Sequence, residues 1–312
     1  MKETAELSGS TGQRIPRQDR GWRPRLVVLD LDGTTVGINE LIPSERVCRA
    51  VRATIAAGVP VSVATGRPVW AALPTTEALG LGGPHAGAGP DASGLDGSGL
   101  DEPEALSMVC SNGSLVYDVV AHRPVHRRFM DPAPALRALA AARPDAGFAV
   151  EHGLAGYRYT ARFPRDFPST FLDEVGLTEL GRSQTIRLSG RVPGVAVPTS
   201  HSRCEVATSW VADAGLDTAR YSYEIGYSGW VDVSAPGVSK ASGVALLARD
   251  LGVAAHEVLV IGDGSNDLSM FEWAGRSVAM GQAPSEVRAA ADEVTASVEE
   301  DGVACVLEKW FG

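Results

Sequence analysis

The chain has 312 residues, of which 44% are hydrophobic and 21% charged, a composition typical of a soluble globular protein with room for two domains. Its formal net charge of -10 argues against nucleic acid as a partner, because binding to a phosphate backbone requires clustered lysine and arginine. The four cysteines lie far apart with no CxxC pair, so a zinc site or a disulfide framework is not supported.

The first 24 residues are polar and include four arginines, and we predict a disordered leader at 1–24 because this stretch has nothing to bury. Apolar runs such as 258–261 are far too short to cross a bilayer. The N-terminus also lacks the apolar segment of a secretory signal. We therefore expect a cytoplasmic protein with no membrane partner; its oligomeric state is not indicated.

The first predicted strand, 26–29, is an uncharged apolar run rich in β-branched residues, which suits a buried strand of a parallel sheet. It is followed by Asp30 and Asp32, whose side chains share a direction because they stand two positions apart in an extended chain. Ligands of open α/β sheets bind beyond the carboxyl ends of the strands. One carboxylate could attack as a nucleophile or hold a metal while the other moves a proton. The alternative is a solvated turn, which Asp and Gly also favour.

A helix is predicted over 44–57, because Ser44 can cap its first turn and apolar residues recur every four positions. A second apolar strand over 59–64 ends in the sequence Thr65-Gly66-Arg67. A strand, helix and strand in this order form a right-handed βαβ unit, which brings the two strand ends together. Another helix is predicted over 68–79.

The stretch 80–104 is dominated by Gly, Ala, Ser, Pro and Asp and has no periodic apolar face, so we predict a flexible insertion. Beyond it, Asn112-Gly113 stands between the apolar runs 108–111 and 115–118, a pattern typical of a hairpin. Asn112 and Gly113 could face the site or simply form the turn.

The pattern changes to mixed α+β in the middle of the chain. Helices are predicted over 134–142 and 202–214, and strands over 147–151, 157–160, 185–188 and 221–225. No catalytic cluster is recognisable there. His122 and His126 could in principle share a metal, but no third ligand is nearby, and solvated surface positions are the preferred interpretation.

Alternating strands and helices return in the last part. A strand at 230–233 precedes a helix that opens with Ser239-Lys240, and a third apolar strand, 258–261, ends in the loop that carries Asp263 and Asp267. A helix at 267–274, a strand at 277–280 and two terminal helices complete the chain. The first and last parts therefore predict one α/β domain with a parallel sheet, interrupted by the middle part.

The ends of the three apolar strands carry residues suited to phosphoryl transfer. Carboxylates bind Mg²⁺, which prefers hard oxygen ligands, and a metal lets an anionic nucleophile approach an anionic phosphate. Thr65 can donate a hydrogen bond to a phosphate oxygen, and the glycine amides of Gly33 and Gly66 add backbone donors. Lys240 supplies a positive charge for the transferring group.

Four segments in this order, DLDGT, ATGR, GVSK and GDGSND, resemble the motifs of the haloacid dehalogenase superfamily. The long insert between ATGR and GVSK, with NGS before it, resembles the Cof-type phosphatases, which carry a large α/β cap. The similarity extends over nearly all of 25–312. It implies a Rossmann-like parallel-sheet core (25–127 and 230–312, with the Gly-rich insertion 80–104) and an inserted α+β cap domain (128–229).

The resemblance also implies roles for individual residues. Asp30 attacks phosphorus and forms an aspartyl-phosphate, while Asp32 protonates the leaving oxygen and then activates water. Thr65 and Lys240 hold the phosphate. Mg²⁺ is held by Asp30, by the carbonyl of Asp32 and by Asp263, with Asp267 as a further or outer-shell ligand. Expected substrate contacts are Gly33, Gly66, Arg67, Asn112 and Asn266, although packing or an ion pair is at least as strong an interpretation for Arg67. Ala241 and Thr35 depart from the family pattern at positions without an assigned chemical role.

The sequence thus predicts a Mg²⁺-dependent phosphatase acting on a small phosphomonoester, a sugar phosphate or a related metabolite. In this branch the cap sets substrate choice, so the middle part should contain the specificity residues, none of which can be named from the sequence. A phosphomutase of the same fold is one alternative. A catalytically silent ligand-binding relative is another, against which the intact Asp30 and Asp32 argue.

Overall fold

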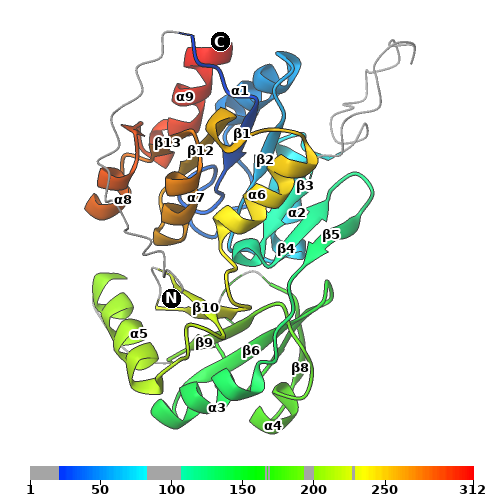
Figure 1. The fold of residues 1–312 in the computed structure, drawn as a ribbon, viewed down its shortest axis with the longest axis vertical. Helices are drawn as coiled ribbons and strands as arrows, with labels where there is room; N and C mark the ends of the chain where they lie inside the picture. The colour runs from blue at the N-terminus through cyan, green and yellow to red at the C-terminus, as the bar shows by residue number, and fades with distance from the viewer. Residues whose placement is uncertain (1–20, 83–106, 166, 168, 193–199, 227–228) are drawn as a thin grey trace, which may run out of the picture.

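The computed structural model describes residues 21–82, 107–165, 167, 169–192, 200–226 and 229–312. Most of the predicted leader and nearly all of the glycine-rich stretch lie outside these ranges. The ribbon forms two lobes: one is built on a parallel sheet with helices on both faces, and the other on a second sheet with helices on one face (Figure 1).

The parallel sheet has the strand order β14-β13-β12-β1-β2, with β1 (Leu26–Leu29) between β12 (Val258–Gly262) and β2 (Val61–Val63). The edge away from β2 is formed by β13 (Arg276–Ala279) and β14 (Glu293–Val294). Every residue of β1, β2 and β12 is buried, as expected for strands covered on both faces. The predicted parallel-sheet core is therefore confirmed.

Alternate residues of β1 face two different helical layers. Val27 and Leu29 pack with α1 (Glu45–Ala56) and α9 (Gly302–Phe311), and the same layer includes α2 (Val69–Ala78). Leu26 and Val28 pack with α6 (Lys240–Asp250) and α7 (Leu268–Trp273), next to α8 (Ser285–Ala290). The sheet is thus enclosed on both sides, and only its ends reach solvent or the second lobe.

A three-stranded antiparallel sheet adjoins the β2 side of the parallel sheet. It consists of β3 (Ser107–Cys110), β4 (Leu115–Asp118) and β5 (Arg123–Arg127). The predicted hairpin is confirmed, and its turn at 111–113 is a 3₁₀ turn in which all three residues have positive φ. The strand β5 was not predicted. Its residue His126 lies 2.8 Å from Asp250 through Nε2 and Oδ2, which fits the surface position that we expected.

The second lobe is built on a six-stranded sheet with the order β10-β11-β9-β6-β7-β8. Its strands are β6 (Gly147–His152), β7 (Gly156–Tyr159), β8 (Phe171–Glu174), β9 (Leu188–Arg191), β10 (Ser222–Ile225) and β11 (Val231–Ser234). The helices α3 (Ala133–Ala142), α4 (Leu177–Leu180) and α5 (Ser200–Ala214) lie against the outer face, away from the parallel sheet (Figure 1). All pairs are antiparallel except that of β7 with β8.

Two strand predictions need correction in this lobe. The strand predicted at 185–188 begins only at Leu188, because the Thr185 hydroxyl donates to the carbonyls of Glu151 and Arg187 and forms a local turn before the ladder. The strand predicted at 230–233 exists as β11, but it pairs with β10 and β9 and not within the parallel sheet. Apolar alternation locates a strand without identifying its sheet. We therefore propose that the inserted unit, here called the cap, extends to about residue 235.

The two segments that connect the core to the cap run side by side. Ser114 Oγ donates to Ser234 Oγ (3.2 Å), and Arg128 Nη2 donates to the carbonyl of Pro236 (3.4 Å). The chain therefore enters and leaves the cap at neighbouring points.

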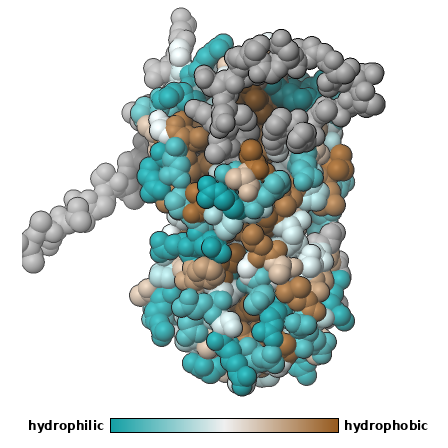
Figure 2. All heavy atoms as spheres, turned by 90° about the vertical axis from the view of Figure 1, so that its right-hand side faces the viewer, coloured by the Kyte–Doolittle hydropathy of each residue, from teal (hydrophilic) through white to brown (hydrophobic). Residues whose placement is uncertain are grey.

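In the face shown in Figure 2, apolar side chains are interspersed with polar ones over both lobes. Within the described ranges, none of the helices has both the length and the apolar character that crossing a membrane requires.

Candidate active site

Asp30 follows the last residue of β1 and is held by its backbone. Its N–H donates to the carbonyl of Ile261 in β12 (2.9 Å), and its carbonyl accepts from the Thr35 hydroxyl (2.5 Å). Only 4% of Asp30 is exposed. The carboxylate is therefore presented at the end of the central strand with little freedom to turn away.

The loop after β12 presents two further carboxylates. Asp267 Oδ2 accepts the backbone N–H groups of Asp263 (2.9 Å) and Gly264 (2.8 Å), which closes the loop on itself. Thr34 Oγ1 donates to Asp263 Oδ1 (3.1 Å) from the segment after β1. Gly33, with φ of 78°, lies so close that a Cβ there would stand 2.3 Å from Asp263 Oδ2. A side chain at position 33 would therefore displace the Asp263 carboxylate.

Lys240, the first residue of α6, completes the cluster. Its Nζ lies 2.6 Å from Asp30 Oδ1 and 2.6 Å from Asp267 Oδ1, and its side chain is fully buried. The helix start is fixed by Ser239, whose hydroxyl accepts from the N–H of Ser242. A Cβ on Gly113 would stand 1.9 Å from the Ser239 carbonyl oxygen, so only glycine allows the 111–113 turn to pack against this helix start.

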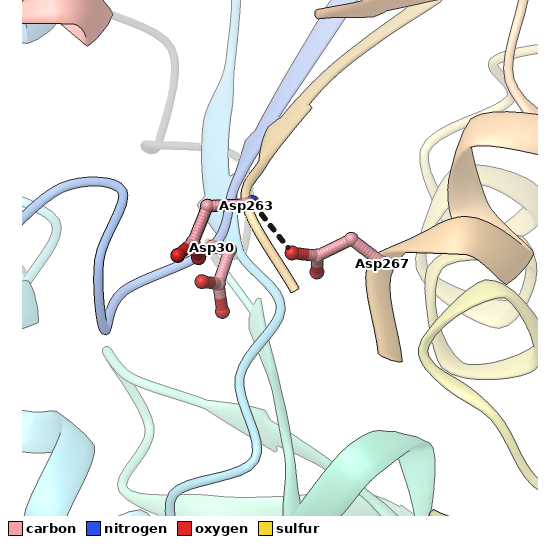
Figure 3. A group of neighbouring side chains, drawn as sticks. All are labelled: Asp30, Asp263 and Asp267. Atoms are coloured by element: carbon pink, nitrogen blue, oxygen red, sulfur yellow. Dashed lines mark hydrogen bonds between the residues drawn. The ribbon is translucent and has the colours of Figure 1, made fainter. Parts of the chain in front are cut away.

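Three carboxylates share one ammonium group in this cluster. Oxygens of Asp30, Asp263 and Asp267 lie within 4.8 Å of one another, and the side chains of Asp30 and Asp263 point toward each other from neighbouring strand ends (Figure 3). Burial raises the pKa of Asp30 well above its usual value, with Asp267 and Asp263 adding to the effect. Burial and Asp267 raise the pKa of Asp263 to about 7. Burial alone would lower the pKa of Lys240, but Asp267 and Asp30 outweigh it and raise the pKa.

With three carboxylates and one lysine, the cluster has more acidic groups than its own lysine can compensate. Closely spaced carboxylate oxygens at a buried strand end are the donor type that Mg²⁺ prefers. Asp30, Asp263 and Asp267 therefore fit a divalent cation. The contribution of the Asp32 carbonyl to such a site stays a prediction.

Thr65, Asn112 and Asn266 connect the loops around this cluster. Thr65 is buried, its hydroxyl accepts the N–H of Arg67 (3.1 Å), and its carbonyl accepts the N–H of Asn112 (3.1 Å). Asn266 Nδ2 donates to Asn112 Oδ1 (3.0 Å). Gly66 lies against the same amide, since a Cβ there would stand 3.1 Å from Asn112 Oδ1. The three strand ends that the sequence predicts to meet are thus joined by hydrogen bonds.

Asp32 stands apart from the other carboxylates. Arg67 Nε donates to Asp32 Oδ2 (2.7 Å) and Arg67 Nη2 donates to Asp32 Oδ1 (2.5 Å), while 37% of the Asp32 side chain is exposed. Arg67 also donates to the carbonyl of Glu40 (2.7 Å). For Arg67, the structure favours the ion-pair alternative over a direct substrate contact.

The inner face of the cap sheet lies over these loops and carries a second charged cluster. Arg187 Nη2 lies 3.1 Å from Glu151 Oε2, and Arg187 Nη1 lies 3.3 Å from Asp232 Oδ2 and donates to the carbonyl of Gly66. Glu151 accepts from Ser111 of the core (2.8 Å), and Asp232 accepts from Asn112 Nδ2 (3.4 Å). The cap thus contacts the core directly beside the predicted phosphate-binding residues.

A family model described as haloacid dehalogenase-like hydrolase matches residues 27–307. The chain belongs to this family. The core and the cap both lie within the matched range, so the family assignment applies to the two lobes together.

Among curated relatives, this haloacid dehalogenase-like hydrolase is 42% identical over 85 residues to a putative phosphatase of Haemophilus influenzae, covering 27% of this chain and 32% of the relative. It is 39% identical over 80 residues to the 5-amino-6-(5-phospho-D-ribitylamino)uracil phosphatase YcsE of Bacillus subtilis, covering 26% and 32%. It is 32% identical over 108 residues to a phosphoglycolate phosphatase of Methanothermobacter thermautotrophicus, covering 35% and 48%. The matched segments span less than half the length of each of these relatives.

Solved structures of the family match over a larger part of the chain. A subclass IIB sugar phosphatase matches with a TM-score of 0.69 at 22% identity, covering 91% of this chain and 98% of that one. A haloacid dehalogenase-like hydrolase from B. subtilis matches with a TM-score of 0.69 at 20% identity, covering 92% and 99%. The fold of this hydrolase, cap included, is therefore that of the capped family members.

Several residues that shape the site of this hydrolase escaped the sequence analysis. Thr34 could have been found, since it lies two positions after Asp32. Thr35 was expected to touch no group with a chemical role, and this is wrong, because its hydroxyl donates to the carbonyl of Asp30. Gln282, whose Nε2 donates to the carbonyl of Gly33, and Arg187 had no signal, because their contacts join segments far apart in the chain.

Proposed function

We propose that this hydrolase is a Mg²⁺-dependent phosphatase that cleaves a small phosphomonoester through an aspartyl-phosphate on Asp30. The observation that carries the proposal is the buried group of Asp30, Asp263 and Asp267 around Lys240. The relatives that the chain resembles include phosphatases named for small phosphorylated metabolites. A sugar phosphate or a related metabolite is the proposed substrate. A cytoplasmic location is proposed from the wide spacing of the cysteines.

In the first step, an Asp30 oxygen forms a bond to phosphorus and the ester P–O bond breaks. Asp32 gives a proton to the leaving alcohol oxygen. Lys240 and Thr65 hold the phosphoryl oxygens, where charge stabilisation supplies most of the catalysis. When bound at the carboxylate cluster, Mg²⁺ supplies the positive charge that lets anionic Asp30 approach an anionic phosphate.

In the second step, water attacks the phosphorus of the aspartyl-phosphate and Asp32 takes a proton from that water. Inorganic phosphate leaves and the Asp30 carboxylate is restored. Arg67 holds the Asp32 carboxylate through two hydrogen bonds. To reach the leaving oxygen in the first step, Asp32 would turn away from Arg67, and its partial exposure leaves room for this movement.

The test is phosphate release by the purified protein from phosphorylated sugars and other small metabolites, with Mg²⁺ and with EDTA. We expect release that requires Mg²⁺ and falls by at least about a thousandfold in Asp30→Asn, because the variant loses the nucleophile. Release that persists in Asp30→Asn would rule out the aspartyl-phosphate. A product that is an isomerised phosphosugar with little free phosphate would instead indicate a phosphomutase.

A further inference from the structure

Glu224 on β10 faces the site from the cap. In the antiparallel register it stands directly opposite Asp232 on β11, and cross-strand partners of this kind point to the same face of a sheet. Asp232 points to the core, because it accepts a hydrogen bond from Asn112 Nδ2. The next residue, Ile225, packs in the apolar layer on the other face. Glu224 therefore projects toward the core.

The contacts of β10 place Glu224 close to the carboxylate cluster. Ser265, in the loop between Asp263 and Asp267, donates through Oγ to the carbonyl of Ile225 (3.3 Å). Partial burial raises the pKa of Glu224 to about 7, against the lowering effect of Lys240, and Asp232 and Asp267 contribute to the rise. Glu224 is thus within electrostatic reach of the residues predicted to hold the phosphate.

Glu224 differs from the other acidic residues of the cap face in having no protein donor. Glu151 and Asp232 each accept hydrogen bonds from Arg187 or from serine and asparagine side chains. Within the ranges that the structure describes, nothing donates a hydrogen bond to the Glu224 carboxylate and no cation pairs with it. A half-buried carboxylate is stabilised when a ligand supplies the missing donor.

We propose that Glu224 selects the alcohol part of the substrate. It accepts a hydrogen bond from a hydroxyl or ammonium group there, and together with Asp232 it disfavours esters whose alcohol part carries a second anion. An ionised carboxylate can only accept hydrogen bonds, and like charges brought together in a partly buried site repel. This inference rests on the proposed phosphatase function and narrows its substrates to neutral or amino-substituted polyol phosphates.

The experiment compares kcat/KM for two groups of esters at pH 8.5, where Glu224 is mostly ionised. Glucose 6-phosphate and glucosamine 6-phosphate form the first group, and phosphoglycolate and 3-phosphoglycerate form the second. Each rate is divided by the same protein's rate on p-nitrophenyl phosphate, whose alcohol part has neither a hydroxyl nor a charge. In the wild type we expect the normalised kcat/KM of the first group to exceed that of the second at least about tenfold. In Glu224→Gln we expect this ratio between the two groups to fall at least about fivefold.

Two further variants make the test specific. Glu174→Gln removes an exposed carboxylate from β8, at the opposite edge of the same sheet, and should leave the ratio unchanged. Glu224→Asp keeps the charge on a shorter side chain, and should still reject the carboxylate esters while losing rate on glucose 6-phosphate. This variant carries the test if Glu224→Gln does not fold.

The outcomes separate the two proposals. If the wild type hydrolyses neither p-nitrophenyl phosphate nor any ester, the phosphatase function falls and the role of Glu224 falls with it. If it hydrolyses them but Glu224→Gln keeps the wild-type ratio, or Glu174→Gln changes the ratio equally, only the role of Glu224 is overturned.

Discussion

Two buried charge clusters face each other across the boundary between core and cap, and they differ in how fully their charges are compensated. The core cluster places Lys240 among three carboxylates. The cap cluster places Arg187 between Glu151 and Asp232. Both bury a cation in the protein, but the core cluster has two more carboxylates than cations and the cap cluster has one more.

The neighbours of each cluster strengthen this difference. In the cap, hydroxyl and amide donors supplement the cation, since Ser111 bonds to Glu151 and Ser189 bonds to Asp232 (2.5 Å). Among the buried side chains that the structure describes, Arg187 Nε alone lacks a partner. In the core, burial raises the pKa values of Asp30 and Asp263, and nearby carboxylates add to the rise. Burial also raises the pKa of Glu151 in the cap, where Arg187 and Ser111 oppose the rise. The cap cluster joins elements of core and cap, whereas the core cluster, with its larger excess of carboxylates, is suited to a ligand cation.

The largest effect is expected from Lys240→Met. Without the ammonium group, Asp30 and Asp267 lose their partner, and the free energy of unfolding in EDTA should fall by about 3–5 kcal/mol. Phosphate release should fall by about 10²- to 10³-fold, as when one preorganised donor is removed from a charge-stabilising site. Urea unfolding and steady-state kinetics measure the two effects. If Lys240→Met were as stable in EDTA as the wild type, this would contradict the inference that the core cluster has an excess of negative charge.

Arg187→Met should lower the free energy of unfolding by a similar amount, about 3–5 kcal/mol, because Glu151 stays buried without its cation. Unlike the effect of Lys240→Met, this loss should be the same with Mg²⁺ and with EDTA. Arg249→Met, at an exposed ion pair, is the control and should change stability by less than about 0.5 kcal/mol. If Mg²⁺ restored the stability of Arg187→Met, the core cluster and the cap cluster would not be independent.

Mg²⁺ itself should stabilise the wild type, since the proposed metal site exists in the folded core cluster and not in the unfolded chain. At a concentration one hundred times its Kd, the expected gain is about 2.7 kcal/mol. Thermal unfolding with increasing Mg²⁺ measures this gain, and Asp263→Asn should reduce it because one ligand oxygen loses its charge. A gain of equal size in Asp263→Asn would exclude this residue from the metal site.

The smallest effect is expected from Gly113→Ala, which tests how closely the 111–113 turn packs on the start of α6. The new methyl group meets the Ser239 carbonyl, and we expect a loss of about 1–3 kcal/mol with a lower kcat, because Lys240 moves with the helix. Gly58→Ala is a matched control with a similar positive φ and no atom near the added Cβ, so it isolates the backbone cost of about 1–2 kcal/mol. If both variants lost the same free energy of unfolding, the contact between position 113 and the Ser239 carbonyl would not explain the loss in Gly113→Ala.

The parallel-sheet core and the meeting of its strand ends were predictable, because buried strands and their polar ends are adjacent in sequence. The runs 26–29 and 258–261 each lead directly into aspartates that the structure brings together. The sheet to which β11 belongs and the partner of Arg187 were not predictable, because both depend on contacts between distant segments. An ion pair of Arg67 was open to sequence reasoning only as one of three alternatives, and its partner Asp32 was not predicted.

The neighbouring connections between core and cap have an evolutionary consequence. Because the chain enters near Arg128 and returns near Pro236, with a hydrogen bond between the two, the parallel sheet does not depend on the insert to bring its own segments together. An insert of different length or shape can occupy the same position without altering the strands that carry Asp30 and Asp263. The parallel-sheet core and the inserted cap can thus diverge at different rates in one gene.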